Sequence, residues 1–421
     1  MGLMWISLLL LVATVCGEAE KPFKGDKVIR VTPKDERELA VVSGLEDHPT
    51  IKVSFWKDAF RPGMDADIHV PAKHYSALVK YLHGEGIKFV IQIFDVQTEV
   101  EMEEVNLGRA GGFFSNYQRL NAINDELRKL ANQPSSVERR VFSVGNSYQG
   151  RPQNAIEIKG KSSSNKPVFF MNCGIHAREW ISPATCMYII SQFVNKYGKD
   201  ASVTQVLDKM DFVIMPVLNV DGYEYTWRSS SRKYRFWRKT LKPSGGWYNC
   251  IGTDPNRNWG HNWGYPGASS NPCSDTYRGK RAFSEIEVKN VADYMRRLGS
   301  RLKGYMDIHA YSQLWMIPWG YTKTPTRDHQ ELMRVSKAGV AAIQRSGYNT
   351  YYRYGPSSVI IYENSGGSKD YTYGKLGIKY SFALELRDRG RYGFLLPPNQ
   401  IIPTGIETFN GILAMAREMR V

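Results

Sequence analysis

His176 and Glu179 are the residues whose types and spacing suggest chemistry most directly. They follow an apolar run at 167–171 that is typical of a buried strand ending in small residues. Their spacing lets an imidazole nitrogen and a carboxylate face one cation, while a third ligand comes from elsewhere. Three protein ligands plus a water form a catalytic zinc site, whereas structural zinc sites are closed. The pair alone is common by chance, and a solvated histidine beside a surface glutamate is the ordinary alternative.

The third ligand is expected at the end of another strand. An apolar strand predicted at 305–308 is followed directly by His309. Two imidazoles and one carboxylate suit zinc and leave one coordination position open. Because a ligand histidine usually donates its second N–H to a carboxylate or a carbonyl, Asp254 is the predicted partner of His176.

From residue 113 onward, predicted strands and helices alternate along the chain. The strands are expected at 140–144, 154–158, 168–171, 212–217, 305–308 and 380–386, and helices at 182–197 and 284–298. This pattern predicts an α/β fold, a single catalytic domain with a mixed sheet of about eight strands flanked by helices. In such sheets, functional sites gather where strands end and loops begin.

A small α+β domain is predicted before this sheet. Its strands are expected at 27–31, 51–56, 66–70 and 88–94, and its helices at 33–44 and 71–83. That order is the split βαβ, or ferredoxin-like, arrangement. An acidic stretch at 99–104 and a glycine-rich segment containing Arg109 follow. A single arginine in an exposed linker predicts cleavage by a trypsin-like protease, and an ordinary interdomain linker is the alternative.

The N-terminus has the features of a secretory signal. An apolar run at 4–15 is followed by small residues that suit cleavage before Glu18. We therefore predict a signal peptide at 1–17, an activation segment at 18–109 and a catalytic domain at 110–421. No segment has the 18 consecutive apolar residues of a membrane span, and residues 414–421 carry no hydrophobic anchor signal. The expected product is a soluble, extracellular protein.

Four cysteines remain beyond Cys16, which leaves with the signal. An even number in an oxidising compartment favours two disulfides, for which three pairings exist. Pairing Cys173 with Cys186 and Cys250 with Cys273 closes the shortest loops, and four buried thiols are the alternative.

Charge is distributed unevenly along the chain. Residues 1–109 hold 13 basic and 17 acidic side chains, whereas the whole chain holds 56 and 41, so the remainder carries a net charge of +19. The acidic N-terminal segment is therefore expected to dock on the basic remainder of the chain. The basic remainder also predicts binding of a heparin-like polyanion. Nucleic acid is not predicted, because no basic run with interleaved aromatics dominates.

Several motifs, taken in order, resemble the secreted zinc metallocarboxypeptidases of the pancreatic A/B type. They lie at 176–180, 219–223, 236–240, 254–259, 309–312, 361–362 and 385–388. The resemblance covers nearly the whole chain, including the activation segment. It implies one zinc ion per chain, hydrolysis of the C-terminal peptide bond of peptides and proteins, and secretion as a zymogen that a trypsin-like protease activates. A monomer is expected.

The resemblance also implies a role for each site residue. His176, Glu179 and His309 correspond to the ligands of a zinc ion that lowers the pKa of its bound water to ~7. Glu385 corresponds to the general base, and Arg238 to an oxyanion donor of a kind typically worth ~3 kcal/mol. The residues that correspond to substrate-binding positions are Arg257, Asn256, Tyr362, Arg235 and Tyr311, with Arg257 suited to a terminal carboxylate by its two-pronged guanidinium.

Lys369 corresponds to the residue that selects the C-terminal side chain. It follows the turn 365–368, and a cation there resembles the O-type branch, which prefers acidic C-termini. The pocket is expected to include Met316, Ser357 and Ala383. A buried lysine without a counter-ion would disfavour the binding of C-terminal residues with non-acidic side chains. Because the segment before Glu385 is one residue longer than in relatives, a pocket built on Asp370 with basic specificity is one alternative. A surface Lys369 beside an apolar pocket is another.

A catalytically inactive relative that binds peptides or glycans is the competing function. The full set of ligands, together with Glu385 and Arg238, argues against it.

Overall fold

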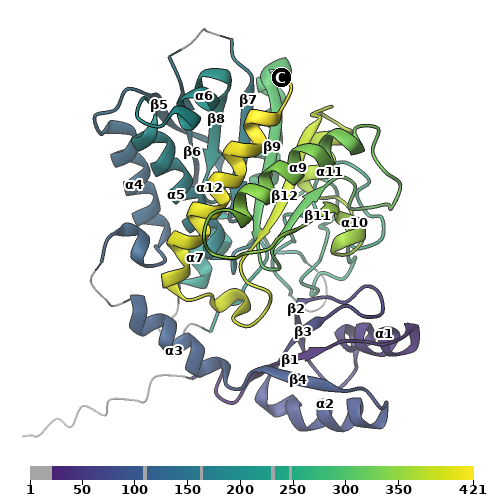
Figure 1. The fold of residues 1–421 in the computed structure, drawn as a ribbon. Helices are drawn as coiled ribbons and strands as arrows, with labels where there is room; N and C mark the ends of the chain where they lie inside the picture. The colour runs from purple at the N-terminus through teal and green to yellow at the C-terminus, as the bar shows by residue number, and fades with distance from the viewer. Residues whose placement is uncertain (1–20, 108–110, 162–164, 229–232, 246–248) are drawn as a thin grey trace, which may run out of the picture.

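The computed structural model describes residues 21–107, 111–161, 165–228, 233–245 and 249–421. The small domain predicted as the activation domain, described here over residues 21–107, lies against one end of the larger domain predicted as the catalytic domain, and the C-terminus lies at the far end (Figure 1). The predicted signal peptide at 1–17 and the predicted cleavage site at Arg109 lie outside the described residues. In the described part of the chain, none of the helices is long and apolar enough to cross a membrane.

The activation domain has the predicted ferredoxin-like order. Its elements are β1 (Lys27–Val31), α1 (Glu36–Ser43), β2 (Ser54–Lys57), β3 (Ala66–Val70), α2 (Ala72–Gly84), β4 (Phe89–Ile93) and α3 (Val96–Leu107). The strands form an antiparallel sheet in the order β2-β3-β1-β4. Ile29, Ile68 and Leu78 are fully buried in its core, so the split βαβ prediction is confirmed.

Two details of this domain differ from the prediction. Helix α1 starts at Glu36, three residues late, because the side chain of Asp35 caps it by accepting a hydrogen bond from the Glu38 N–H. The acidic stretch at 99–104 lies within α3, for which no helix was predicted. Val96 and Val100 on α3 are buried in the same core as the catalytic domain, which explains why this acidic segment is helical.

The catalytic domain is built on one mixed sheet of eight strands. They are β5 (Glu138–Asn146), β6 (Pro152–Lys159), β7 (Val168–Cys173), β8 (Asp211–Met215), β9 (Leu302–Ala310), β10 (Leu314–Ile317), β11 (Arg353–Pro356) and β12 (Tyr380–Leu386). Their order is β11-β10-β12-β9-β7-β8-β6-β5, and the four central strands are parallel. All six predicted strands are present. Only the short β10 and β11 are missing from the prediction.

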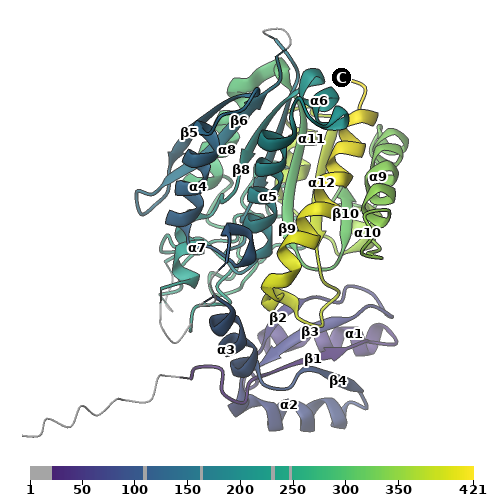
Figure 2. The same cartoon turned by 60° about the vertical axis from the view of Figure 1, so that its left-hand side comes forward.

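Helices cover both faces of the sheet (Figures 1 and 2). They are α4 (Leu120–Asn132), α5 (Ile181–Lys196), α6 (Ala201–Lys209), α7 (Val220–Thr226), α8 (Ile286–Leu298), α9 (His329–Gln344), α10 (Ser357–Ile360), α11 (Ser368–Gly374) and α12 (Ile401–Glu418). Side chains alternate across each strand, so Phe169 on β7 joins the core beneath α5 and α12, while Phe170 joins the core beneath α8. The central parallel strands are therefore buried on both faces, and their carboxyl ends meet at one edge.

Candidate active site and metal centre

The loop after β7 positions the first two predicted ligands. It turns at Gly174, whose φ is +61° and whose added Cβ would lie 3.0 Å from Cγ of Pro183. A side chain is therefore strained at this position, and glycine is required. His176 and Glu179 follow before α5 begins at Ile181, and both are buried.

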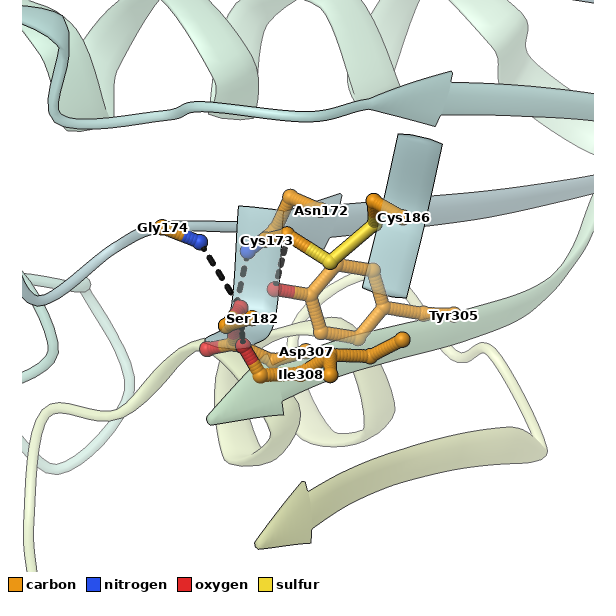
Figure 3. The surroundings of a disulfide bond; sticks show 8 residues. All are labelled: Asn172, Cys173, Gly174, Ser182, Cys186, Tyr305, Asp307 and Ile308. Atoms are coloured by element: carbon orange, nitrogen blue, oxygen red, sulfur yellow. Dashed lines mark hydrogen bonds between the residues drawn. A yellow bond between two sulfur atoms is a disulfide. The ribbon is translucent and has the colours of Figure 1, made fainter. Parts of the chain in front are cut away.

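A disulfide and a serine fix the start of this loop (Figure 3). Cys173 at the end of β7 is bonded to Cys186 on α5, and Cys250 is bonded to Cys273, so the sequential pairing is confirmed. The hydroxyl of Ser182 accepts a hydrogen bond from the Gly174 N–H at 3.0 Å and donates to the carbonyl of Ile308 at 2.5 Å. The loop is thus fixed to the neighbouring strand β9.

His309, at the carboxyl end of β9, completes the cluster because β7 and β9 are adjacent and parallel. The donor atoms of His176, Glu179 and His309 lie within 4.8 Å of one another. Nδ1 of His176 is 2.7 Å from Oε1 of Glu179, and Nδ1 of His309 is 3.3 Å from Oε2. Burial would raise the pKa of Glu179, but the two histidines outweigh it and lower that pKa. Two imidazole nitrogens and one ionised carboxylate thus converge on one buried point, and this arrangement fits a zinc ion.

Asp254 lies behind this cluster, as predicted. Its Oδ1 is 3.1 Å from Nε2 of His176, and its Oδ2 accepts from Nη2 of Arg238 at 2.7 Å. Burial disfavours the charge, but Arg238 and His176 outweigh it, and the pKa of Asp254 lies well below its ordinary value. One carboxylate therefore orients both a predicted ligand and the predicted oxyanion donor.

Glu385 lies beside His309, with which it pairs across β12 and β9. Burial raises the pKa of Glu385 to about 8, and the charge of His309 opposes this shift. Nη1 of Arg238 is 3.3 Å from Nδ1 of His176, so Arg238 also faces the cluster. Glu385 and Arg238 line a cavity of about 840 Å³ together with all three cluster residues.

Arg257 also lines this cavity. Its Nε donates to the carbonyl of Gly267 at 2.7 Å and its Nη1 to the carbonyl of Asn256 at 3.0 Å. Nη2 is buried and has no hydrogen-bond partner among the described residues. Tyr362 lies with its ring 5.8 Å from the guanidinium carbon. A buried donor left unpaired is costly, so this arrangement suits an anionic guest.

Lys369 lines the cavity, and Asp370 is not among the described lining residues. Nζ of Lys369 donates to Oδ1 of Asp370 at 3.0 Å. Oδ2 of Asp370 accepts from the backbone N–H of Gly320 at 2.8 Å and of Tyr321 at 3.3 Å. The expectation of an uncompensated cation is therefore wrong, because Lys369 brings a buried counter-ion. The expected neighbours Met316, Ser357 and Ala383 also line the cavity.

Comparison with known proteins agrees with this geometry. Residues 123–411 match the family described as zinc carboxypeptidase, and residues 29–103 match the carboxypeptidase activation peptide. The chain belongs to the zinc carboxypeptidase family. It is 40% identical to carboxypeptidase A1 of Bos taurus, with 97% of each chain covered. It is 39% identical to carboxypeptidase B of Homo sapiens, with 98% of each covered.

A solved structure of thrombin activatable fibrinolysis inhibitor superposes with a TM-score of 0.85 at 35% identity, over 94% of this chain and 98% of that one. This chain is accordingly a metallocarboxypeptidase with an activation peptide, and its metal is zinc. His176, Glu179 and His309 form the group able to hold that ion.

The activation domain covers the cavity of this carboxypeptidase. Asp58, in the connection after β2, lines the cavity and interacts electrostatically with Arg238 and Arg257. Tyr311, which was predicted to contact substrate, donates its hydroxyl hydrogen to Asp67 of the activation domain at 2.8 Å. Arg235, which was also predicted to contact substrate, is fully buried and is not among the described residues that line the cavity. In this form both side chains are engaged by the activation domain.

Sequence reasoning missed Asp307, a fully buried residue of β9 whose Oδ2 lies 3.0 Å from Nε2 of His309. A signal for it existed. Aspartate interrupts an otherwise apolar strand two residues before His309, and side chains two apart lie on the same face of a strand.

Proposed function

We propose that this carboxypeptidase is secreted as a zymogen and, once its activation segment is removed, preferentially releases C-terminal glutamate and aspartate. The observation that carries the acidic preference is the placement of Lys369 in the wall of the cavity that also contains Arg257. Two cationic groups in one cavity suit a C-terminal residue that bears both a terminal and a side-chain carboxylate.

Binding of the terminal carboxylate is assigned to Arg257 and Asn256. Nη2 of Arg257, which has no hydrogen-bond partner in the described part of the chain, offers a charge-assisted hydrogen bond. Asn256 is oriented because its Oδ1 accepts from the N–H of Ser368 at 2.9 Å, which leaves the amide nitrogen for other partners. Tyr362 is assigned to cover the bound residue, since its ring lies beside Arg257.

Hydrolysis is assigned to Glu385 and Arg238. Zinc, when bound, supplies a Lewis acid that activates water and polarises the scissile carbonyl. Glu385 receives a proton from the attacking water and delivers it to the departing amine nitrogen as the C–N bond breaks. Arg238, held by Asp254, places positive charge where the carbonyl oxygen gains negative charge. One water is consumed, and a shortened peptide and a free amino acid are produced.

The ion pair with Asp370 reduces, but does not remove, the selectivity expected of Lys369. An ammonium group has three hydrogens, and one is used at Oδ1 of Asp370. The others can donate to a substrate carboxylate, and a charge-assisted hydrogen bond is worth roughly 1.5–3 kcal/mol. We therefore expect an acidic preference of roughly 10-fold to 100-fold over an apolar residue of similar size.

The test compares kcat/KM for matched peptides ending in Glu, Arg and Phe after activation with trypsin. Glutamate should be released fastest. A higher value for Arg would favour the Asp370 pocket, and a higher value for Phe would favour the apolar walls formed by Met316, Ile361 and Ala383. Lys369→Met keeps the length of the side chain without its charge and should abolish the difference between Glu and Phe.

A metal chelator should abolish release of every one of these residues, and added zinc should restore it. Release that survives complete removal of zinc would contradict the assigned chemistry. Binding of a heparin-like polyanion remains a prediction from the charge distribution, to be checked by salt-dependent retention on heparin.

A further inference from the structure

Asp307 occupies the centre of a buried hydrogen-bond network beneath the metal site. Its Oδ1 accepts from Nδ2 of Asn172 at 2.6 Å, and the Asn172 amide is itself oriented by the hydroxyl of Tyr305, 2.7 Å from its Oδ1 (Figure 3). Its Oδ2 accepts from the hydroxyl of Ser368 at 2.6 Å and lies 3.0 Å from Nε2 of His309. The carboxylate is therefore held from both sides.

The surroundings of His309 determine which ring nitrogen carries hydrogen. Nδ1 faces the other two ligands, at 3.2 Å from Nδ1 of His176 and 3.3 Å from Oε2 of Glu179. Nε2 faces away from them, toward Asp307. A carboxylate can only accept a hydrogen bond, so Nε2 must be the N–H that donates. The lone pair of Nδ1 is then directed at the metal site.

Asn256 is the competing neighbour of Nε2, because its NH2 group taken alone would favour the opposite tautomer, with Nε2 as acceptor. Its Nδ2 lies 3.2 Å from Nε2 of His309, and its orientation is set by Ser368, whose N–H needs Oδ1 as acceptor. The carboxylate of Asp307 is closer, at 3.0 Å, and its charge makes it the stronger partner, so Nε2 donates to Asp307 and does not accept from Nδ2. The amide hydrogens of Asn256 then stay available to a substrate carboxylate. By keeping the ring hydrogen of His309 on Nε2, Asp307 favours both metal binding at Nδ1 and substrate binding by Asn256.

We propose that Asp307 is a positioning residue, which holds His309 in the tautomer and ring orientation needed to bind zinc. It would do for His309 what Asp254 does for His176, so both ligand histidines are backed by carboxylates. This inference rests on the proposed function only through the assignment of His309 as a ligand. It does not depend on which C-terminal residue the enzyme prefers.

The test measures zinc affinity of the full-length protein by competition with a chelator, and the visible spectrum of the cobalt-substituted protein. In Asp307→Asn, the amide oxygen still accepts from Asn172, and the NH2 group faces Nε2 of His309. That contact favours the opposite tautomer, with hydrogen on Nδ1. We expect zinc affinity to fall 10-fold to 100-fold and the cobalt bands to shift.

Two variants serve as controls. Ser368→Ala removes the other partner of Oδ2 but keeps the contact with His309, so zinc affinity should stay within about threefold. His309→Ala should lose more affinity than Asp307→Asn, and no loss there would refute the ligand assignment itself. Asp307→Ser, which removes the carboxylate from Nε2 of His309, replaces Asp307→Asn if the latter does not fold. Unchanged zinc affinity and unchanged cobalt bands in a folded Asp307 variant would overturn the proposal.

Discussion

The carboxylate of Glu103 and the guanidinium of Arg235 form a two-pronged, fully buried ion pair between the activation and catalytic domains. Nε of Arg235 donates to Oε2 of Glu103 at 2.7 Å and Nη2 to Oε1 at 2.8 Å. Arg235 also lies over the ring of Trp180, with its guanidinium carbon 3.7 Å from the ring centroid. Glu103 belongs to helix α3, so the helix next to the predicted cleavage site is held to the catalytic domain by charge.

Glu103→Gln should therefore weaken retention of the activation segment. The substitution leaves Arg235 buried without an anion, which costs about 3 kcal/mol and corresponds to roughly 100-fold in affinity. After limited trypsin cleavage, carboxypeptidase activity should appear sooner than in the wild type. The measurement is the time course of activity beside the time course of cleavage.

Glu101→Gln is the matched control, since Glu101 lies on the same helix but pairs with the exposed Lys21. It should leave the time course unchanged. The fully activated enzymes should be identical, because both positions precede Arg109. Equal lag times for the Glu103 and Glu101 variants would contradict the role of the buried pair.

Asp370→Asn should sharpen the preference for acidic C-termini. The amide oxygen can still accept from Gly320 and Tyr321, so the backbone stays in place, but the charge that offsets Lys369 is lost. The ratio of kcat/KM for Glu over Leu should rise roughly tenfold, or about 1.4 kcal/mol. Asp293→Asn, on the exposed part of α8, is the control and should leave the ratio unchanged. A lower ratio in Asp370→Asn would mean that Asp370 is needed to hold Lys369 in the pocket.

Glu287→Gln should stabilise the protein above neutral pH. Glu287 is fully buried, accepts one hydrogen bond from the Tyr148 N–H, and has no partner for Oε2 among the described residues. Burial raises its pKa to about 7, with Glu285 and Asp221 adding to the shift. Asp221 is itself paired with Arg151. The folded protein therefore takes up a proton that the unfolded chain releases at lower pH.

Because this pKa is raised, the contribution of Glu287 to the stability of the fold depends on pH. The favourable contribution of the neutral Glu287 is complete at acidic pH and is lost as pH rises through about 7. Above that, the buried charge costs about 3 kcal/mol, which glutamine avoids. Thermal unfolding at pH 8 should therefore have a higher midpoint in Glu287→Gln, with little difference at pH 5. Glu138→Gln, an exposed residue of β5, should show no difference at either pH. An equal gain at both pH values would contradict the buried-charge explanation.

The Cys173–Cys186 disulfide should contribute about 3 kcal/mol to stability, since the bond closes a loop of 13 residues. Urea unfolding of Cys173→Ala/Cys186→Ala at matched pH gives the measurement. A loss below about 1 kcal/mol would show that packing of β7 against α5 suffices without the bond.

Local features of the sequence determined the chemistry of this protein. His176 and Glu179 lie in one short loop, and His309 directly ends an apolar strand, so residue type and spacing suggested the ligand set, and the resemblance of several motifs in order supported it. Alternating apolar patterns likewise predicted six of the eight strands and the ferredoxin-like order. The missing β10 and β11 are four residues each, too short for a periodic pattern to show.

Only the tertiary structure decided which charged side chains form ion pairs. Lys369 and Asp370 are neighbours on α11, where successive side chains point about 100° apart. The way in which α11 packs against the sheet therefore determines that Lys369 lines the cavity and that Asp370 accepts a hydrogen bond from the backbone of Gly320. Glu103 and Arg235 are 132 positions apart, and no sequence period relates them. Pairing across such distances follows from how whole elements dock, and docking is a property of buried surfaces rather than of local pattern.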